Sequence, residues 1–399
     1  MHHASLDQAF AHLFEWCRKR DFAGYDPFDA LNSKLFQVTF LKHSRSARLA
    51  WTQLFKRSPI NLRSPALVSA ERNSKGVALF ALSALANFRR LRTKESEAEA
   101  RKLIDDLLSM RLDGWSGAAW GYNFDWQSRV LFAPRGTPTL VPTAFAARAL
   151  IEAFSAFEDD AYLQAARSTC DFIIEDLPRS VENETEICFS YTPDSNTRVY
   201  NASLLAAETL SSVGGLMREE ALSKLAWRAT RYVVARQNED GSWPYGADAN
   251  QAWVDNFHTA FLLSSLARIF KSCDTADARE FSVSLRRGYE FWRTSFFLAD
   301  GWPKYYHDTL YPADAHAAAS AIITLSDLRD LDPRALAFAE RIAFWCVENL
   351  RDPRGFFYYQ RRRFFTVRTP FMRWSQAWML YALARLLEET RNSTQSHLR

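Results

Sequence analysis

An aspartate lies just ahead of a histidine at the start of two nearly apolar segments. Asp255 and His258 form the first pair, and Asp314 and His316 form the second. Histidine moves protons near neutral pH, and tyrosine or a carboxylate can share that work. Both pairs occupy the same phase of an internal repeat, which predicts that they face one cavity. The candidate catalytic residues are His258, His316, Tyr306, Asp255 and Asp314.

Aromatic and hydrogen-bonding residues gather at the same phase, around each turn that leads into an apolar segment. Sugar rings stack their C–H faces on Trp and Tyr, while polar tips bind the hydroxyl groups. The pattern therefore predicts a carbohydrate site. Its candidate substrate-binding residues are Trp120, Tyr122, Asp125, Tyr200, Asn201, Trp243, Tyr245, Asn256, Trp302, Lys304, Tyr305, His307, Tyr311, Arg361, Arg373 and Trp374.

These residues also have purely structural interpretations. The tryptophan of a Gly-Trp turn can plug its own hairpin, and an aspartate can be the N-cap of the helix that follows it. The two histidines can be core residues with satisfied ring nitrogens. Arg361 begins a run of three arginines that can form a solvated hairpin. The coincidence of polar residues at one phase of several repeats favours the functional interpretation.

The turns themselves reveal the repeat. Asp-Gly or Arg-Gly pairs begin at 113, 240, 300 and 354, and an aromatic residue follows each of them. The gap between the first two holds two units, so the period is about 55–63 residues. A period of this length made of two helices indicates a solenoid or a closed ring.

The predicted helices alternate in character. One set is amphipathic, as expected of an outer layer with one wet face. The other set is apolar or small nearly all round, which favours a closed ring over an open solenoid. We therefore expect an all-α protein, a single (α/α)6 toroid of about twelve helices in two concentric layers. The outer helices are expected at 44–57, 96–111, 159–176, 217–237, 277–296 and 333–350, and the inner ones at 75–88, 139–154, 200–213, 256–269, 313–326 and 372–387.

The toroid is expected to span 44–390. Residues 1–43 would form a helix and a loop packed on it, and 391–399 a frayed tail. Less than about a tenth of the chain is expected in strands.

Composition narrows the function. The net charge of +4 over 399 residues is small, so neither nucleic acid nor an anionic membrane is expected as the main partner. No apolar run approaches the length of a spanning helix. Five cysteines lie far apart with no CxxC pair, as expected of buried thiols in a reducing compartment. With no visible signal peptide, we expect a cytoplasmic protein without a cofactor or a metal site.

Part of the second turn, Gln237-x3-Gly241-x-Trp243, resembles the QW repeat of squalene cyclase and prenyltransferase toroids. The acidic DxDD motif of the cyclases and the zinc ligands of the prenyltransferases are absent. The segments 24–33, 240–258 and 304–316 resemble a bacterial group encoded with surface-polysaccharide biosynthesis genes. D-glucuronyl C5-epimerases and toroid polysaccharide lyases are more distantly similar in architecture.

These features predict a carbohydrate-active enzyme that acts on a surface-polysaccharide or glycoconjugate precursor, such as a lipid-linked oligosaccharide or a nucleotide sugar. Proton abstraction beside a uronate carboxylate needs a base, an acid and a cation. His258 or His316 with Tyr306 could move the proton, and Arg373 or Arg361 could supply the cation. Hydrolysis instead needs two carboxylates about 5–10 Å apart, for which Asp125, Asp255 and Asp314 are candidates. An isoprenoid-processing toroid and a non-catalytic glycan-binding scaffold remain as alternatives, and the oligomeric state is left open.

Overall fold

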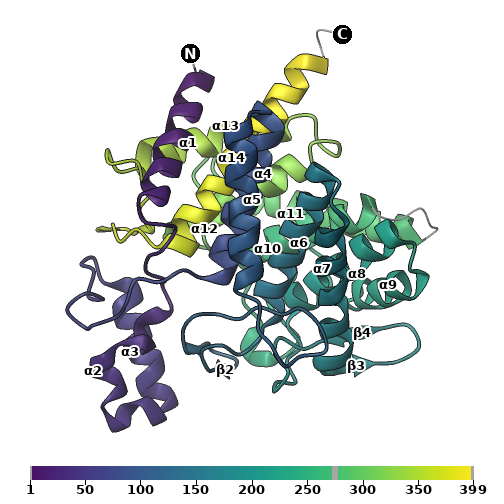
Figure 1. Cartoon of the computed structure of the whole chain (residues 1–399), viewed down its shortest axis with the longest axis horizontal. Helices are drawn as coiled ribbons and strands as arrows, with labels where there is room; N and C mark the ends of the chain where they lie inside the picture. The colour runs from purple at the N-terminus through teal and green to yellow at the C-terminus, as the bar shows by residue number, and fades with distance from the viewer. Residues whose placement is uncertain (1, 272–276, 397–399) are drawn as a thin grey trace.

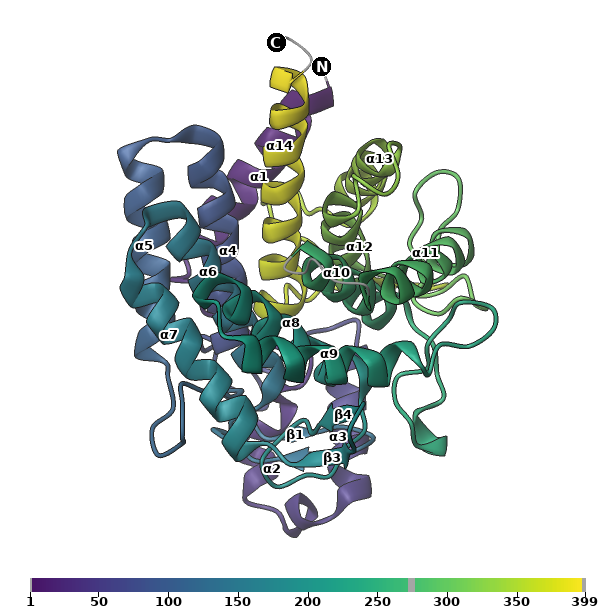
Figure 2. The same ribbon diagram turned by 90° about the vertical axis from the view of Figure 1, so that its right-hand side faces the viewer.

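Twelve helices of the described chain form two concentric layers. A computed structural model describes residues 2–271 and 277–396. The inner layer holds the nearly apolar helices, and the outer layer wraps them (Figures 1 and 2). The inner helices are α4 (Ser74–Leu91), α6 (Leu140–Phe157), α8 (Tyr200–Met217), α10 (Asn256–Lys271), α12 (Ala315–Asp327) and α14 (Trp378–Ser396). The outer helices are α1 (His2–Arg18), α5 (Lys94–Ser109), α7 (Asp160–Asp171), α9 (Glu220–Val234), α11 (Asp277–Ser295) and α13 (Ala335–Asn349).

The inner layer closes on itself. Each inner helix packs against the next one in chain order, and α14 packs back against α4. Each outer helix packs mainly against one inner helix: α5 on α4, α7 on α6, α9 on α8, α11 on α10, α13 on α12 and α1 on α14. This arrangement confirms the predicted toroid and excludes the open solenoid.

Glycines in the repeated turns allow the hairpins to lie close to their neighbours. Gly241, Gly301 and Gly355 have φ of +91°, +95° and +102°, which favours glycine. A Cβ on each would come within 2.5, 2.9 and 2.9 Å of the carbonyl oxygens of Arg287, Arg341 and His12. These carbonyls belong to α11, α13 and α1, so the same contact is made by three successive outer helices.

The last of these contacts corrects one predicted element. The helix expected at 44–57 is present as α3 (Arg45–Arg57), but α1 takes the sixth outer position. The predicted boundary at residue 44 therefore differs from the observed packing. The N-terminal helix is part of the ring, and the segment after it is not.

That segment, 26–68, forms a protrusion at one end of the ring, where α2 and α3 are seen in Figure 1. Phe55 of α3 packs with Ala30, Ala66 and Val68 in a small core of its own. The buried Arg63 guanidinium binds Asp29 Oδ1 at 2.6 Å. Its short elements are η1 (Asp29–Asn32), α2 (Lys34–Gln37) and η2 (Phe40–His43).

The remaining elements are short. Three small antiparallel sheets lie in the loops, in agreement with the expected low strand content. Their strands are β1 (Trp126–Gln127) with β2 (Phe132–Ala133), β3 (Arg179–Glu182) with β4 (Ile187–Phe189), and β5 (Ala313–Asp314) with β6 (Gln360–Arg361) and β7 (Thr366–Val367). The π-helical turn η3 (Phe172–Asp176) follows α7, η4 (Ala249–Gln251) precedes α10, and the π-helical turn η5 (Met372–Ala377) leads into α14.

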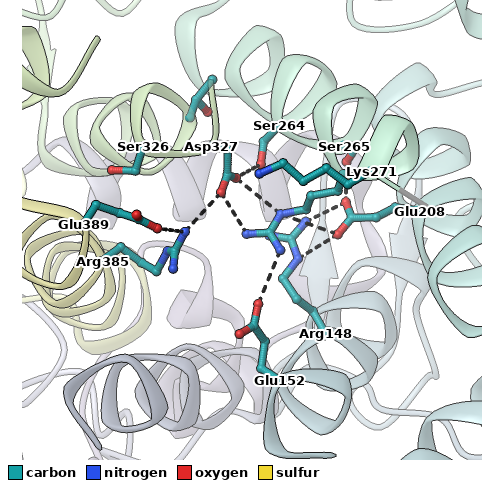
Figure 3. Close-up of polar contacts among 12 residues, drawn as sticks. Arg148, Glu152, Glu208, Ser264, Ser265, Lys271, Ser326, Asp327, Arg385 and Glu389 are labelled. Carbon is teal, nitrogen blue, oxygen red and sulfur yellow. Dashed lines mark hydrogen bonds and ion pairs between the residues drawn. The ribbon is translucent and has the colours of Figure 1, made fainter. Parts of the chain in front are cut away.

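Toward the C-terminal ends of the inner helices, charged side chains turn toward one another across the ring (Figure 3). Arg148 of α6 binds both carboxylate oxygens of Glu208 on α8, at 2.9 and 2.6 Å. Arg385 of α14 lies 2.8 Å from Glu389 and 3.6 Å from Asp327. We call this group the far-end ion network; its members are Arg89, Arg148, Glu152, Glu208, Arg268, Asp327, Arg385, Glu388 and Glu389.

Three smaller predictions concern the ends of the chain and its composition. The expected tail from 391 is helical as far as Ser396, and 397–399 lie outside the described residues. Cys17, Cys170, Cys188 and Cys346 are buried free thiols, while Cys273 lies outside the described residues. Within the described chain only α6 is long and apolar enough to span a membrane, and 67% of it is buried as an inner helix.

Candidate functional site

A cavity of about 280 Å³ opens at the end of the ring where the inner helices begin. Every inner helix contributes a residue from its first turn or from the turn just before it. The protrusion and the β1–β2 and β6–β7 hairpins complete the walls, and Figure 2 shows β1, α2 and α3 at this end. The inner-helix residues that line the cavity include Lys75 (α4), Val141 (α6), Asn201 (α8), His258 (α10), His316 (α12) and Trp374 (before α14).

His258 is held in one orientation by Asp255. The Asp255 Oδ1 atom accepts a hydrogen bond from the His258 backbone N–H at 3.0 Å, which caps the start of α10. Asp255 Oδ2 lies 2.7 Å from His258 Nδ1 and also accepts from Trp253 Nε1 at 3.1 Å. Because an ionised carboxylate can only accept, Nδ1 carries the proton in this pair. Nε2 of a neutral His258 is then the nitrogen that can take a proton from a substrate.

His316 lies deeper, in an aromatic enclosure. Its ring centroid is 4.2 Å from that of Trp374 and 4.6 Å from those of Phe257 and Trp378. Neither ring nitrogen has a hydrogen-bond partner in the described protein, although the side chain lines the cavity. Burial and then the nearby charge of Lys75 lower the pKa of His316 well below 6.5. The ring is therefore neutral near pH 7, so one nitrogen can accept a proton and the other can donate a hydrogen bond.

The two histidines face a common aromatic surface. The Phe257 ring lies 4.0 Å from the His258 ring and 4.6 Å from the His316 ring, measured between centroids. Tyr306 lines the same cavity, and burial followed by the charge of Asp255 raises the pKa of its phenol. A phenol with a raised pKa keeps its proton at pH 7, so Tyr306 can act there as a hydrogen-bond donor or acid.

Lys75 brings an amine to the floor of the cavity. It is almost fully buried, and its Nζ atom lies 4.5 Å from the Phe145 ring centroid and 5.2 Å from that of Trp378. Burial, followed by the charge of Arg373, lowers the pKa of Lys75 well below 10.5. In either protonation state the amine can donate a hydrogen bond to a substrate oxygen.

The structure brings ten of the candidate residues together around this cavity. Among the proposed catalytic residues these are His258, His316, Tyr306 and Asp255. Among the proposed substrate-binding residues they are Tyr122, Asn201, Tyr245, Tyr305, Arg373 and Trp374.

Asp314 does not line the cavity. It is fully buried as the N-cap of α12, where Oδ1 accepts from the backbone N–H groups of His316 and Ala317 at 2.8 and 3.2 Å. Its Oδ2 accepts from Gln360 Nε2 at 2.6 Å. Burial raises the pKa of this carboxyl. The structural interpretation as an N-cap therefore fits Asp314, whereas Asp255 is both a cap and a cavity residue.

Three candidate tryptophans are hairpin plugs rather than cavity residues. The indole N–H of Trp120 donates to the Leu107 carbonyl at 2.8 Å, and that of Trp243 to the Val233 carbonyl at 3.0 Å. Both indoles thereby cap the last turn of the preceding outer helix. Trp302 is also buried and donates to a loop carbonyl.

Asn256, Lys304 and Arg361 are occupied by bonds within the fold. Asn256 Nδ2 donates to the Lys304 carbonyl at 2.8 Å, and its Oδ1 accepts from a buried indole. Lys304 Nζ donates to two backbone carbonyls, at 2.8 and 3.1 Å. Arg361 donates to the Asn349 side chain at 2.6 Å.

The other candidates outside the cavity have equally local contacts. Asp125 Oδ1 accepts from the Arg135 backbone N–H at 2.8 Å. Tyr200 packs edge-on against another tyrosine, and Tyr311 packs edge-on against a tryptophan. His307 is exposed, beside two phenylalanines.

Arg373 lines the cavity but is already paired. Its guanidinium binds both oxygens of Asp26 at 2.6 and 2.8 Å, and both side chains are buried. The charge predicted to face a substrate carboxylate is thus neutralised by a residue of the protrusion.

Several cavity residues were missed by the sequence analysis. They are mostly cations and aromatics that lie outside the repeated turns. The run of three arginines from Arg361 was the one signal for Arg362. The main additions are Phe28, Lys56, Arg57, Arg129, Trp253, Gln360 and Arg362. Lys75 and Trp126 also line the cavity, at the end of the ring where their place in the repeat puts them.

No three His, Cys, Asp or Glu side chains of the described chain come together in a way that could hold a metal ion.

No protein family model matches the sequence, and a search of curated proteins finds no match. Solved structures do share the fold. Cellobiose 2-epimerase from Bacillus thermoamylovorans aligns with a TM-score of 0.62 at 13% identity, over 82% of this chain and 90% of that one. An unsaturated glucuronyl hydrolase specific for heparin aligns with a TM-score of 0.62 at 13% identity, over 98% of both chains. The GH76 α-mannanase of Bacteroides thetaiotaomicron aligns with a TM-score of 0.62 at 10% identity, over 82% and 90%. At such identities the similarity establishes the α/α toroid alone.

Proposed function

We propose that the protein is a carbohydrate-active enzyme that moves a proton at a sugar carbon next to a carbonyl or a carboxylate group. This step is common to epimerases and to lyases that act on uronates. The observation that carries the proposal is the pair of histidines on neighbouring inner helices, both facing one cavity. Structural neighbours named as an epimerase and a polysaccharide lyase are consistent with it, whereas those named as hydrolases fit the hydrolytic alternative.

The chemistry follows from the environment of each side chain. Nε2 of His258, oriented by Asp255, would take the proton from the carbon, and the electron pair of the broken C–H bond would move toward the carbonyl or carboxylate oxygen. Lys75 would donate a hydrogen bond to that oxygen. In an epimerase, His316 would first take up a proton from solvent and would then give it to the opposite face of the carbon, while His258 would release its proton to solvent. In a lyase, His316 or Tyr306 would give a proton to the departing glycosidic oxygen.

A uronate is the substrate that the cavity charge favours. Lys56, Arg57, Arg129 and Arg362 line the cavity, whereas Asp255 is the lining carboxylate among the described residues. A carboxylated sugar gains from this imbalance. A uronate-bearing precursor of a surface polysaccharide in the cytoplasm therefore remains the proposed substrate and location.

Hydrolysis with paired aspartates has less support. It needs two carboxylates on either side of the glycosidic bond. Asp314 is consumed as an N-cap and Asp125 is bound by the backbone of residue 135. The polar and basic lining also gives no support for an isoprenoid substrate.

Isotope incorporation tests the proposal. The protein would be incubated in heavy water with glucuronate-containing oligosaccharides and with nucleotide-linked glucuronate, and the sugars analysed by NMR and mass spectrometry. We expect deuterium at the carbon beside the carboxylate. Labelled oxygen from water in a released reducing end, without deuterium at carbon, would contradict proton transfer and favour hydrolysis.

A further inference from the structure

Four cations at the mouth of the cavity come from segments outside the ring. Lys56 and Arg57 end helix α3 of the protrusion, Arg129 lies in the β1–β2 turn, and Arg362 lies in the β6–β7 turn. We call these four residues the cation rim. Three parts of the chain that are distant in sequence thus bring one sign of charge to one opening.

Three of the rim residues, Lys56, Arg57 and Arg362, repel one another. The positive charges of Arg57 and Arg362 both act on the ammonium of Lys56, and burial together with these charges lowers its pKa to about 8. The charge of Arg57 likewise acts on the Arg362 guanidinium, and the charges of Arg129 and Arg57 act on the Tyr306 hydroxyl. These mutual effects place the four cations around one space rather than on separate faces.

Carboxylates offset this repulsion only in part, because Asp314 and Asp26 act on the Lys56 charge without forming an ion pair with it. Within the described residues none of the four forms an ion pair; their contacts are with aromatic rings, a phenol and an amide. Lys56 Nζ lies 4.4 Å from the Phe28 ring centroid, and the Arg129 guanidinium lies 5.3 Å from that of Trp253. Arg362 donates to Gln360 Oε1 at 3.0 Å. A like-charged cluster of this kind lowers the free energy of a bound anion and destabilises the free protein.

We infer that the cation rim binds a second, multiply charged anionic group of the substrate, outside the sugar that lies between the two histidines. The group is a diphosphate of an activated sugar or the carboxylates of neighbouring uronates. Three guanidinium groups suit either, because their planar forks match the paired oxygens of phosphate and carboxylate. The inference rests on the proposed function only for the position of the reacting sugar.

Calorimetric titration of the full-length protein tests the rim. The probes are inorganic pyrophosphate, a glucuronate-containing oligosaccharide and free glucuronate. We expect the Arg57→Gln/Arg129→Gln/Arg362→Gln variant to lose at least about tenfold in affinity, or about 1.4 kcal/mol, for pyrophosphate or the oligosaccharide. Affinity for free glucuronate, which carries a single carboxylate, should fall by less than affinity for the multiply charged probe, because the rim acts on it only through the positive potential of the cavity. Wild-type binding of the charged probe should also weaken with added salt.

Arg363→Gln is the matched control, because Arg363 is exposed on the same hairpin and does not line the cavity. Binding of pyrophosphate would identify a phosphate group as the ligand, and binding of the oligosaccharide alone would identify uronate carboxylates. An equal loss in the control, unchanged binding in the triple variant, or no binding of either charged probe would overturn the inference.

The two proposals fail separately. If no sugar exchanges hydrogen with solvent while the arginine-dependent binding persists, the proposed function is wrong and the rim stands. If exchange occurs and the triple variant binds both charged probes normally, the reverse holds.

Discussion

The two ends of the inner helices differ in whether their charged side chains have partners of opposite charge. In the far-end ion network, each guanidinium lies opposite at least one carboxylate, as Arg148 does with Glu208 (Figure 3). At the mouth, the cation rim has no such partners in the described chain, and both ring nitrogens of His316 are unbonded. A buried charge must be paired to be tolerated, whereas an unpaired one is available to a ligand. The same ring therefore contains an end built for stability and an end built for binding.

The sharpest test of this contrast is to remove the histidines from the mouth. We expect His258→Asn and His316→Asn each to lower the rate of hydrogen exchange into the sugar by roughly 10²–10⁴, as is usual for an acid–base group. Folding, followed by circular dichroism, should be retained because neither ring nitrogen of His316 is bonded in the fold and His258 is bonded only to Asp255. His307→Asn is the control outside the cavity. Wild-type exchange in both histidine variants would remove the catalytic assignment.

The corresponding change at the far end should act on stability alone. Arg148→Met leaves the buried Glu208 carboxylate without its bidentate partner, so we expect a loss of roughly 3 kcal/mol or more in the free energy of unfolding. Urea unfolding measures it. The double variant Arg148→Met/Glu208→Leu should regain part of the loss, since it removes the stranded charge. A loss of probe binding in the folded single variant would break the comparison, because it would couple the two ends.

Lowering the pH should remove the stability that the Glu152 carboxylate contributes to the far-end ion network. Burial alone would raise the pKa of Glu152, but the guanidinium groups of Arg89 and Arg268 outweigh it and lower the pKa from 4.5 to about 2. A carboxyl with a lowered folded-state pKa contributes stability that is present above 4.5 and lost as the pH falls through about 2. This amounts to as much as about 3 kcal/mol. Urea midpoints across that range should fall less steeply for Glu152→Gln than for the wild type; equal slopes would contradict the assignment.

The smallest expected effect is at the rim. With a pKa of about 8, Lys56 is charged below that pH and neutral above it. Affinity for pyrophosphate should therefore fall as the pH rises through 8, by roughly tenfold or less because the three arginines stay charged. Asp314 and Asp26 oppose the shift, and Arg57 and Arg362 enlarge it. Lys56→Arg should flatten the pH profile, and an unchanged profile would exclude Lys56 as its source.

The fold was largely predictable because its signals are local. Glycine turns and alternating amphipathic and apolar helices repeat at a fixed period, and these features specify two layers. Periodicity identifies the apolar face of a helix but not the helix that covers it. For that reason α3 was assigned to the ring and α1 was not, although the apolar positions of α1, such as Phe10 and Leu13, were visible.

The site was predictable only in part. His258 and His316 could be predicted because they occupy the same position in successive repeats, and that position determines the end of the ring at which a side chain lies. The role of Arg373 was not predictable in this way, because its partner Asp26 is distant in sequence. Trp243 and Trp253 are close in the chain, yet one plugs a hairpin and the other borders the cavity. Residue type and position in the repeat do not show whether a side chain lines the cavity or is used within the fold. The direction of the side chain decides this.

The packing of α1 has a consequence for biosynthesis. Its apolar face, which includes Leu6, Phe10 and Leu13, is covered by α13 and α14. On a ribosome that adds roughly 5–20 residues per second, α14 is completed tens of seconds after α1 has been synthesised. Until α14 is synthesised, the apolar face of α1 is not covered by it, and α4 lacks the inner helix that packs against it on that side. Chaperones that bind exposed apolar segments could therefore bind α1 throughout the synthesis of the segment between α1 and α14.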